Sequence, residues 1–289
     1  MGFLNDPYHW WVEPFTTNPF MTRALLAGLL TVVATSVIGT WVVLRGMSFL
    51  GDALAHGVLP GIAVAFIAGF DTTVGAMVAA LVMVGLVHAV RTRSPLPDDV
   101  GIGLLFVGML SFGVVIISSR RSSYVGDLNR FLFGSVTGVD SADLLRLTVV
   151  AVVAVAGTLV LYRALLVLTF DETLARMVGL RPRLTHLALL TLMALAIVAT
   201  FGVVGNLLVI AFLIAPPATA VLVARRVPVI MAVAVALGAV SVVVGILISF
   251  HAGTAASATM ALVSVALFLV VLVLRPLIPG ARALGPRTR

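Results

Sequence analysis

Long apolar runs dominate this chain, and they limit its possible folds more than any other feature. Each run approaches the 20 or so residues that a helix needs to cross a hydrocarbon core of about 30 Å. The runs lie near 24–44, 48–69, 74–90, 102–118, 144–162, 184–203, 205–223, 229–250 and 255–274. Because a spanning segment must satisfy its own backbone groups, these runs predict helices. We therefore expect an all-α, polytopic membrane bundle of about nine spans, with eight or ten left open by ambiguity at 48–69 and 184–223.

Composition supports one membrane domain over residues 1–289. Hydrophobic residues make up 61% of the chain and charged residues 10%, whereas soluble domains carry about 25% charged residues. Residues 1–22 are expected to form an interfacial tail, because Trp10 and Trp11 suit a membrane–water boundary. Residues 275–289 form an arginine-rich tail.

Lysine and cysteine are both missing, and their absence excludes several chemistries. All 18 basic residues are arginine, so the chain has no lysine for a phosphate-binding loop that would hold ATP. With no cysteine, it has neither disulfides nor thiolate metal ligands. Any metal must therefore bind His, Asp, Glu, Asn, Met or backbone oxygens. We find no catalytic triad and no nucleic-acid surface, and expect a transport subunit, not an enzyme.

The arginines also predict an orientation, because cytoplasmic loops are enriched in basic residues. If the loop at 163–183 is cytoplasmic, most arginines fall on that side. The exceptions are Arg23, Arg120, Arg121, Arg130 and Arg146. This distribution favours an external N-terminus and a cytoplasmic C-terminus.

Asp52 and His56 are the most informative polar residues inside a predicted span. They are four residues apart, so a helix places both side chains on one face. Ionisable groups cost about 2.5–3.5 kcal/mol each at the centre of a bilayer, which makes an ion path the default interpretation. The alternative is that Asp52 caps the helix and His56 bonds a backbone carbonyl.

The helix that carries this pair has a second feature. Small residues recur every fourth position from Ala53 through Gly57 and Gly61 to Gly69, which predicts close packing against another helix. Pro60 is expected to bend the helix locally, since it removes a backbone donor.

A short helix is predicted over 171–179, between two spans. Asp171 is a suitable N-cap, Glu172 lies in the first turn, Gly179 follows the end and Pro182 lies beyond. So short a helix needs a partner surface to be stable. Alternatively, these residues could simply mark the ends of a surface helix.

The remaining candidates are weaker. Asn206 lies within a span and could line a path, or equally form an interhelical hydrogen bond. His251 opens an external turn and could touch incoming metal, although an interfacial position is favoured. His9, His88 and His186 are expected to be solvated.

Several motifs together resemble the permease subunit of the zinc/manganese/iron ABC importers. They are LRGMS at 44–48, GDALAH at 51–56, LPG at 59–61, LFGS at 132–135, FDE at 170–172 with Ala175 and Gly179, and VG at 204–205 followed by Leu208, Leu213 and 216–220. The resemblance covers about residues 20–275. This chain departs from the family pattern at Asn206, where a hydroxyl residue is usual.

The resemblance implies a type II ABC importer-like permease in the cytoplasmic membrane of a prokaryote. It implies a second permease protomer, a cytoplasmic ABC ATPase dimer that binds ATP, and an extracytoplasmic metal-binding protein, all in contact with membrane lipid. Asp52 and His56 would lie in the metal path, and Asp171, Glu172, Ala175 and Gly179 would belong to the helix that docks into the ATPase. The transported zinc or manganese, with iron as a further candidate, would be the substrate, and no resident cofactor is implied.

Three alternatives remain at this point. A siderophore or cobalamin permease would use the same machinery with a wide cavity. A stand-alone channel or intramembrane enzyme would need no ATPase. A scaffold would tolerate loss of Asp52 and His56.

Overall fold

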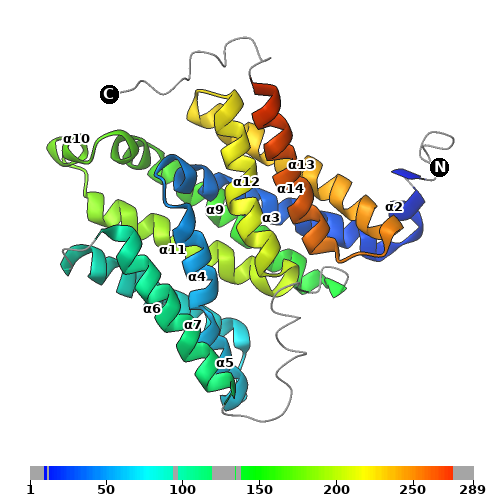
Figure 1. Ribbon diagram of the computed structural model, residues 1–289, viewed down its shortest axis with the longest axis horizontal. Helices are drawn as coiled ribbons and strands as arrows, with labels where there is room; N and C mark the ends of the chain where they lie inside the picture. Colours follow the sequence, from blue (N-terminus) through cyan, green and yellow to red (C-terminus); the bar gives the residue numbers. More distant parts are fainter. Residues whose placement is uncertain (1–9, 12, 94–96, 119–133, 135–137, 276–289) are drawn as a thin grey trace.

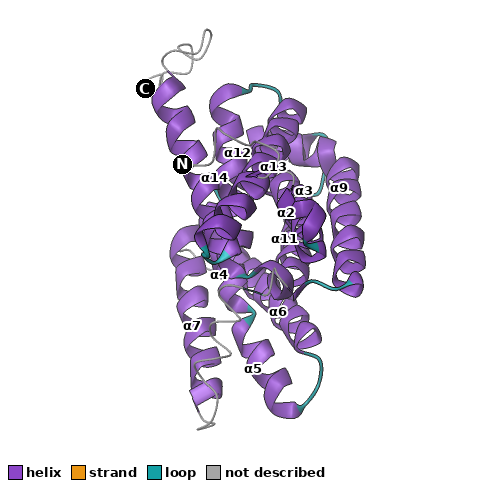
Figure 2. Ribbon diagram, turned by 90° about the vertical axis from the view of Figure 1, so that its right-hand side faces the viewer, coloured by secondary structure: helices purple, strands orange, loops and turns teal. Residues whose placement is uncertain are grey.

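The computed structural model describes residues 10–11, 13–93, 97–118, 134 and 138–275, and nothing outside these residues is discussed in structural terms (Figure 1). The described residues fold as helices and connecting turns (Figure 2). The LFGS motif, apart from its glycine, and the C-terminal tail after Arg275 lie outside them.

The described residues contain nine helical segments that are long and apolar enough to span a membrane, which confirms the predicted fold class. The helices up to residue 170 are α2 (Glu13–Thr17), α3 (Pro19–Leu44), α4 (Ser48–Gly57), α5 (Leu59–Ala68), α6 (Thr72–Arg93), α7 (Asp98–Ser118) and α9 (Ser141–Phe170). Those that follow are α10 (Glu172–Met177), α11 (Pro182–Val204), α12 (Asn206–Val223), α13 (Val227–Ala252) and α14 (Ala256–Leu274). Helices α4 and α5 together make one span.

Helix α3 forms the centre of the bundle. It packs against α9, α12 and α13, and its Trp41 is completely buried. A Cβ atom on Gly39 would lie 2.0 Å from the carbonyl oxygen of Leu213, so only glycine allows α3 and α12 to approach this closely. A second group of helices, α4 to α7, lies beside this centre and connects to it through α11 (Figure 1).

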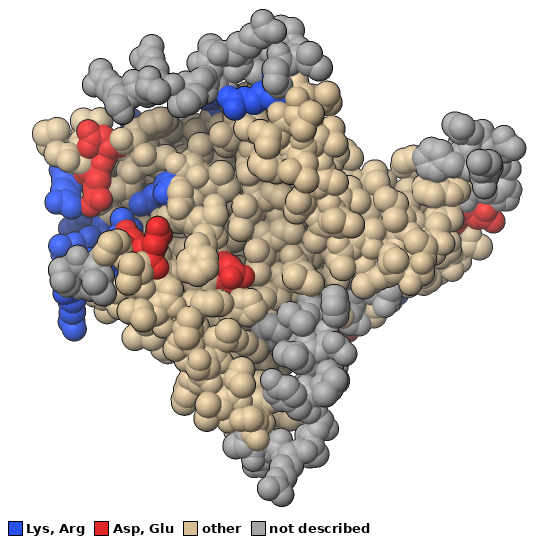
Figure 3. Space-filling view, viewed as in Figure 1, with Lys and Arg blue, Asp and Glu red and all other residues tan. Residues whose placement is uncertain are grey.

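Basic residues gather at one end of the bundle. The end is formed by the α3–α4 turn, the C-terminal end of α6, α10 and the start of α11, and it carries Arg45, Arg91, Arg176 and Arg183. Figure 3 shows blue arginines gathered along the left-hand side of the molecule, with red acidic residues beside them. We call it the arginine-rich end.

Candidate metal path

Asp52 and His56 face each other on α4, as their spacing predicts. The Nε2 atom of His56 lies 3.5 Å from Oδ1 of Asp52, and the side chains are 22% and 33% exposed, respectively. Both side chains are therefore partly sheltered and partly accessible. The pair lies on a wall that also includes α7, because the ring of Phe106 packs edge-on against His56 with 5.5 Å between centroids.

The span bends immediately after this pair. Helix α4 ends at Gly57 and α5 begins at Leu59, with Pro60 in its first turn, where a missing N–H costs least. The predicted bend is thus a one-residue kink at Val58, whose φ of −81° and ψ of −16° remain helical. Beyond it, Gly61 lies so close to Gly75 of α6 that a Cβ atom would come within 2.0 Å of the Gly75 carbonyl oxygen. This contact packs α5 closely against α6 just beyond the bend.

Asn206 completes the polar cluster from another helix. It is the first residue of α12, after Gly205 with a φ of 81°, and only 1% of its surface is exposed. Its Nδ2 lies 3.3 Å from Nε2 of His56. Among the described residues its Oδ1 is buried without a hydrogen-bond partner. The interhelical hydrogen bond, one of the two alternatives weighed from sequence, is therefore present, and a role for Asn206 in the metal path stays a prediction.

The geometry of the pair suits one cation. Oδ1 of Asp52 and Nε2 of His56 lie 3.5 Å apart. For an ion about 2.1 Å from each atom, the angle Oδ1–ion–Nε2 would be about 113°, close to the tetrahedral value. No group of three or more His, Cys, Asp or Glu side chains forms a metal cluster within the residues that the structure describes. One copy of the site thus offers a carboxylate, an imidazole and an amide, and further ligands must come from water or another chain.

His251 lies elsewhere. It is the second-last residue of α13, its ring stacks on Trp10 at 4.2 Å between centroids, and its Nδ1 bonds the Leu247 carbonyl. Helix α13 is not one of the helices packed closely around α4. These contacts favour the interfacial alternative for His251.

The predicted short helix is present as α10, with the expected ends. The carboxylate of Asp171 accepts hydrogen bonds from the backbone N–H groups of Thr173 and Leu174, and Gly179 closes the helix with a φ of 78°. Ala175 is completely buried, whereas the flanking Glu172 is exposed. A hydrogen bond from Arg176 lowers the pKa of Glu172 below its usual value. The helix therefore presents a charged face and is held to the bundle by a small residue.

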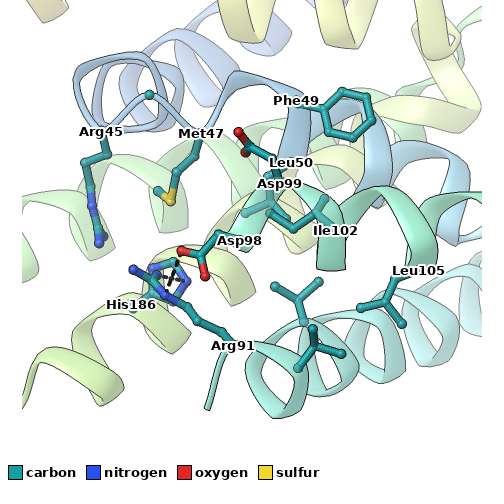
Figure 4. A pocket seen from close by; sticks show the side chains of 13 residues that line it. Arg45, Met47, Phe49, Leu50, Arg91, Asp98, Asp99, Ile102, Leu105 and His186 are labelled. Atoms are coloured by element: carbon teal, nitrogen blue, oxygen red, sulfur yellow. Dashed lines mark hydrogen bonds and ion pairs between the residues drawn. The ribbon is translucent and has the colours of Figure 1, made fainter. Parts of the chain in front are cut away.

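One sequence prediction is wrong. His186, expected to be solvated, is only 6% exposed, and its Nε2 lies 2.7 Å from Nη1 of Arg91. Arg91 also pairs with Asp98 at 3.1 Å (Figure 4). The error arose because arginines near His186 in sequence suggested solvent, whereas α6 and α7 cover it. No local sequence pattern pairs Arg91 with His186, since they lie 95 positions apart.

Arg45 joins this group from the α3–α4 turn. Burial lowers its pKa to about 10, with repulsion from Arg91 acting in the same direction and Glu172 opposing it. The arginine-rich end thus concentrates charge within the protein as well as on its surface.

Comparison with known proteins agrees with this architecture. The model of the ABC 3 transport family matches residues 17–275. The chain is 34% identical to the manganese transport system membrane protein MntC of Listeria innocua, over 89% of this chain and 91% of that protein. It is also 34% identical to the chelated iron transport system membrane protein YfeD of Yersinia pestis, over 96% and 93%.

Solved structures give the same result. PsaBC from Streptococcus pneumoniae in complex with Fab contains a chain with a TM-score of 0.80 and 30% identity, covering 91% of this chain and 94% of that one. A metal-chelate type ABC transporter in an inward-facing conformation has a TM-score of 0.72, with coverage of 87% and 85%. At 16% identity, the second similarity concerns the fold alone.

Proposed function

The chain belongs to the ABC 3 transport family, and on that premise we propose that it is the permease subunit of an ATP-driven importer for a divalent metal cation. The observation that supports a metal cargo is the Asp52–His56–Asn206 cluster beside the kink between α4 and α5. A carboxylate, an imidazole and an amide are ligands for manganese, iron or zinc, whereas a large organic cargo requires no such set. The names of MntC and YfeD, which refer to manganese and chelated iron, support the first two metals.

In this mechanism the cation moves from water to Oδ1 of Asp52 and Nε2 of His56. Binding at Nε2 replaces the hydrogen bond with Asn206, whose amide is then free to turn its oxygen toward the ion. Charge on Asp52 offsets the cost of stripping water from the cation, since it neutralises one of its two charges. A second permease protomer would supply the ligands that one chain lacks.

Coupling to ATP is assigned to α10. The arginine-rich end would face the cytoplasm, which puts the N-terminus outside and the C-terminus inside. There α10 would dock on a separate ABC ATPase through its exposed face around Glu172, with Asp171 and Gly179 holding the helix ends and Ala175 fixing it to the bundle. An extracytoplasmic binding protein would deliver the metal at the opposite end.

Whole-cell metal content tests the cargo. Cells lacking the chain would be complemented with wild type, Asp52→Asn or His56→Ala and grown with manganese, iron or zinc. We expect the content of one metal to fall in the deletion strain and to be restored by the wild type but not by Asp52→Asn or His56→Ala. Asp71→Asn is the matched control, because Asp71 is an exposed carboxylate in the α5–α6 turn. Unchanged content of all three metals would overturn the proposal and favour an organic cargo.

A further inference from the structure

Two neighbouring cavities at the arginine-rich end have no part in the metal path. One, of about 220 Å³, lies between the α3–α4 turn, α6 and α7 (Figure 4). The other, of about 180 Å³, lies between α6, α10 and the start of α11, and we call it the basic cavity. Arg45, Arg91 and His186 line both.

Positive charge exceeds negative charge around the basic cavity. Glu172 is the only carboxylate among its described lining residues, against four arginines, Arg45, Arg91, Arg176 and Arg183. Glu172 is already engaged by Arg176 at 2.7 Å, and Asp98 is engaged by Arg91. Within the described part of the chain, the buried Nη1 of Arg45 has no hydrogen-bond partner. Burial, with repulsion from Arg91 acting in the same direction, lowers the pKa of Arg45 to about 10.

His186 adds a second buried donor. Because an arginine can only donate, the contact from Nη1 of Arg91 requires Nε2 of His186 to accept, which leaves the ring hydrogen on Nδ1. His186 is only 6% exposed, and its Nδ1 has no hydrogen-bond partner among the described residues. A buried donor without an acceptor is unfavourable, and two residues that line this cavity, Arg45 and His186, each carry one.

The ligand must be an anion that accepts several hydrogen bonds. We propose that the basic cavity binds a phosphate group, either of an anionic phospholipid headgroup or of a free phosphate ion, through Arg45 and His186. The cavity lies where three spans end, since Leu168, Arg91 and Pro182 line it near the ends of α9, α6 and α11. Basic pockets between spans at this depth bind anionic headgroups.

The position of the cavity gives the ligand a consequence for α10, which rests on the proposed coupling function. Arg176 and Glu172 of α10 form one wall, and Arg45 and His186 belong to the bundle. A bound phosphate would neutralise the mutual repulsion of the arginines and hold α10 against α6 and α11. The anion site would thus set how firmly the docking helix is attached.

Thermal unfolding of the full-length chain, delipidated in neutral detergent, tests the site without metal, ATP or partners. One arm adds sodium phosphate against sodium chloride at equal ionic strength. The other adds phosphatidylglycerol against phosphatidylcholine. We expect at least one ligand to raise the wild-type midpoint by about 3 °C or more at ten times its dissociation constant. A rise with phosphate identifies the free ion, and a rise with phosphatidylglycerol alone identifies the headgroup.

Variants make the result specific. Arg45→Gln should abolish the rise, and exposed Arg183→Gln, which leaves the bundle interior intact, should reduce it. Arg226→Gln, in the turn between α12 and α13 and outside the cavity lining, should keep it. The proposal is overturned if neither ligand stabilises the wild type, or if Arg183→Gln and any folded Arg45→Gln protein respond as the wild type does. Because no transport is measured, this failure is distinct from failure of the proposed function.

Discussion

Replacing Asn206 with leucine should lower metal transport without weakening the fold. The change removes the 3.3 Å hydrogen bond to His56, which is worth about 0.5–1.5 kcal/mol. It also removes the buried Oδ1, which has no partner in the described structure and costs about 1–3 kcal/mol. Leucine is close to asparagine in shape and suits a site that is 1% exposed. The net effect on the free energy of unfolding is therefore a gain of about 1 kcal/mol.

The assay pairs thermal unfolding of the purified variant with metal uptake by cells that produce it. We expect the unfolding midpoint to rise by about 2–4 °C and uptake to fall at least tenfold. Asn206→Ser, which keeps a small polar group, should retain more uptake than Asn206→Leu. Two results would refute the reasoning. Unchanged uptake would remove Asn206 from the path, and a fall in midpoint that parallels the fall in uptake would make its role purely structural.

Three further changes follow from the packing and the helix ends. Gly61→Ala should lower the free energy of unfolding by about 1–3 kcal/mol, because the new Cβ would lie 2.0 Å from the Gly75 carbonyl oxygen. Gly85→Ala, where a Cβ would meet nothing within 4 Å, should be neutral or stabilising. The unfolding midpoints of the two variants test this difference. Asp171→Ala should weaken α10 by about 0.5–2 kcal/mol and lower the ATPase activity of the assembled complex, while Asp171→Ser restores it. The lowered pKa of Glu172 means that its stabilising contribution is present above the ordinary carboxyl pKa and is lost as pH falls through the lowered value. Unfolding midpoints of wild type and Glu172→Gln should therefore converge as pH falls through that window, and a constant difference would contradict the prediction.

Features encoded by local sequence could be predicted. The spans follow from the length of apolar runs, and the ends of α10 follow from Asp171 and Gly179, because each signal acts within one turn of the residue that carries it. The approach of Asp52 to His56 is equally local, since one helical turn separates them. The bend near Pro60 followed from its missing N–H.

Contacts between distant segments could not be predicted in this way. Asn206 meets His56 across 150 positions, and Arg91 meets His186 across 95. These pairs depend on how α4, α6, α11 and α12 pack, which one sequence does not specify. The burial of His186 was missed for this reason, since its arginine neighbours are typical of a solvated helix end until a second helix covers them.

Uptake of radiolabelled manganese into liposomes that contain the permease and its ATPase tests the central claim most directly. Asp52→Asn removes the one negative charge that this chain offers to the divalent ion. Removing one partner of a sheltered charge pair costs about 2–5 kcal/mol of interaction free energy. If that cost appears in the transport barrier, uptake slows by at least about thirtyfold. The account predicts ATP-dependent uptake by wild type and Asp71→Asn, and a loss of that size in Asp52→Asn. ATP-dependent uptake by Asp52→Asn at the wild-type rate would contradict it.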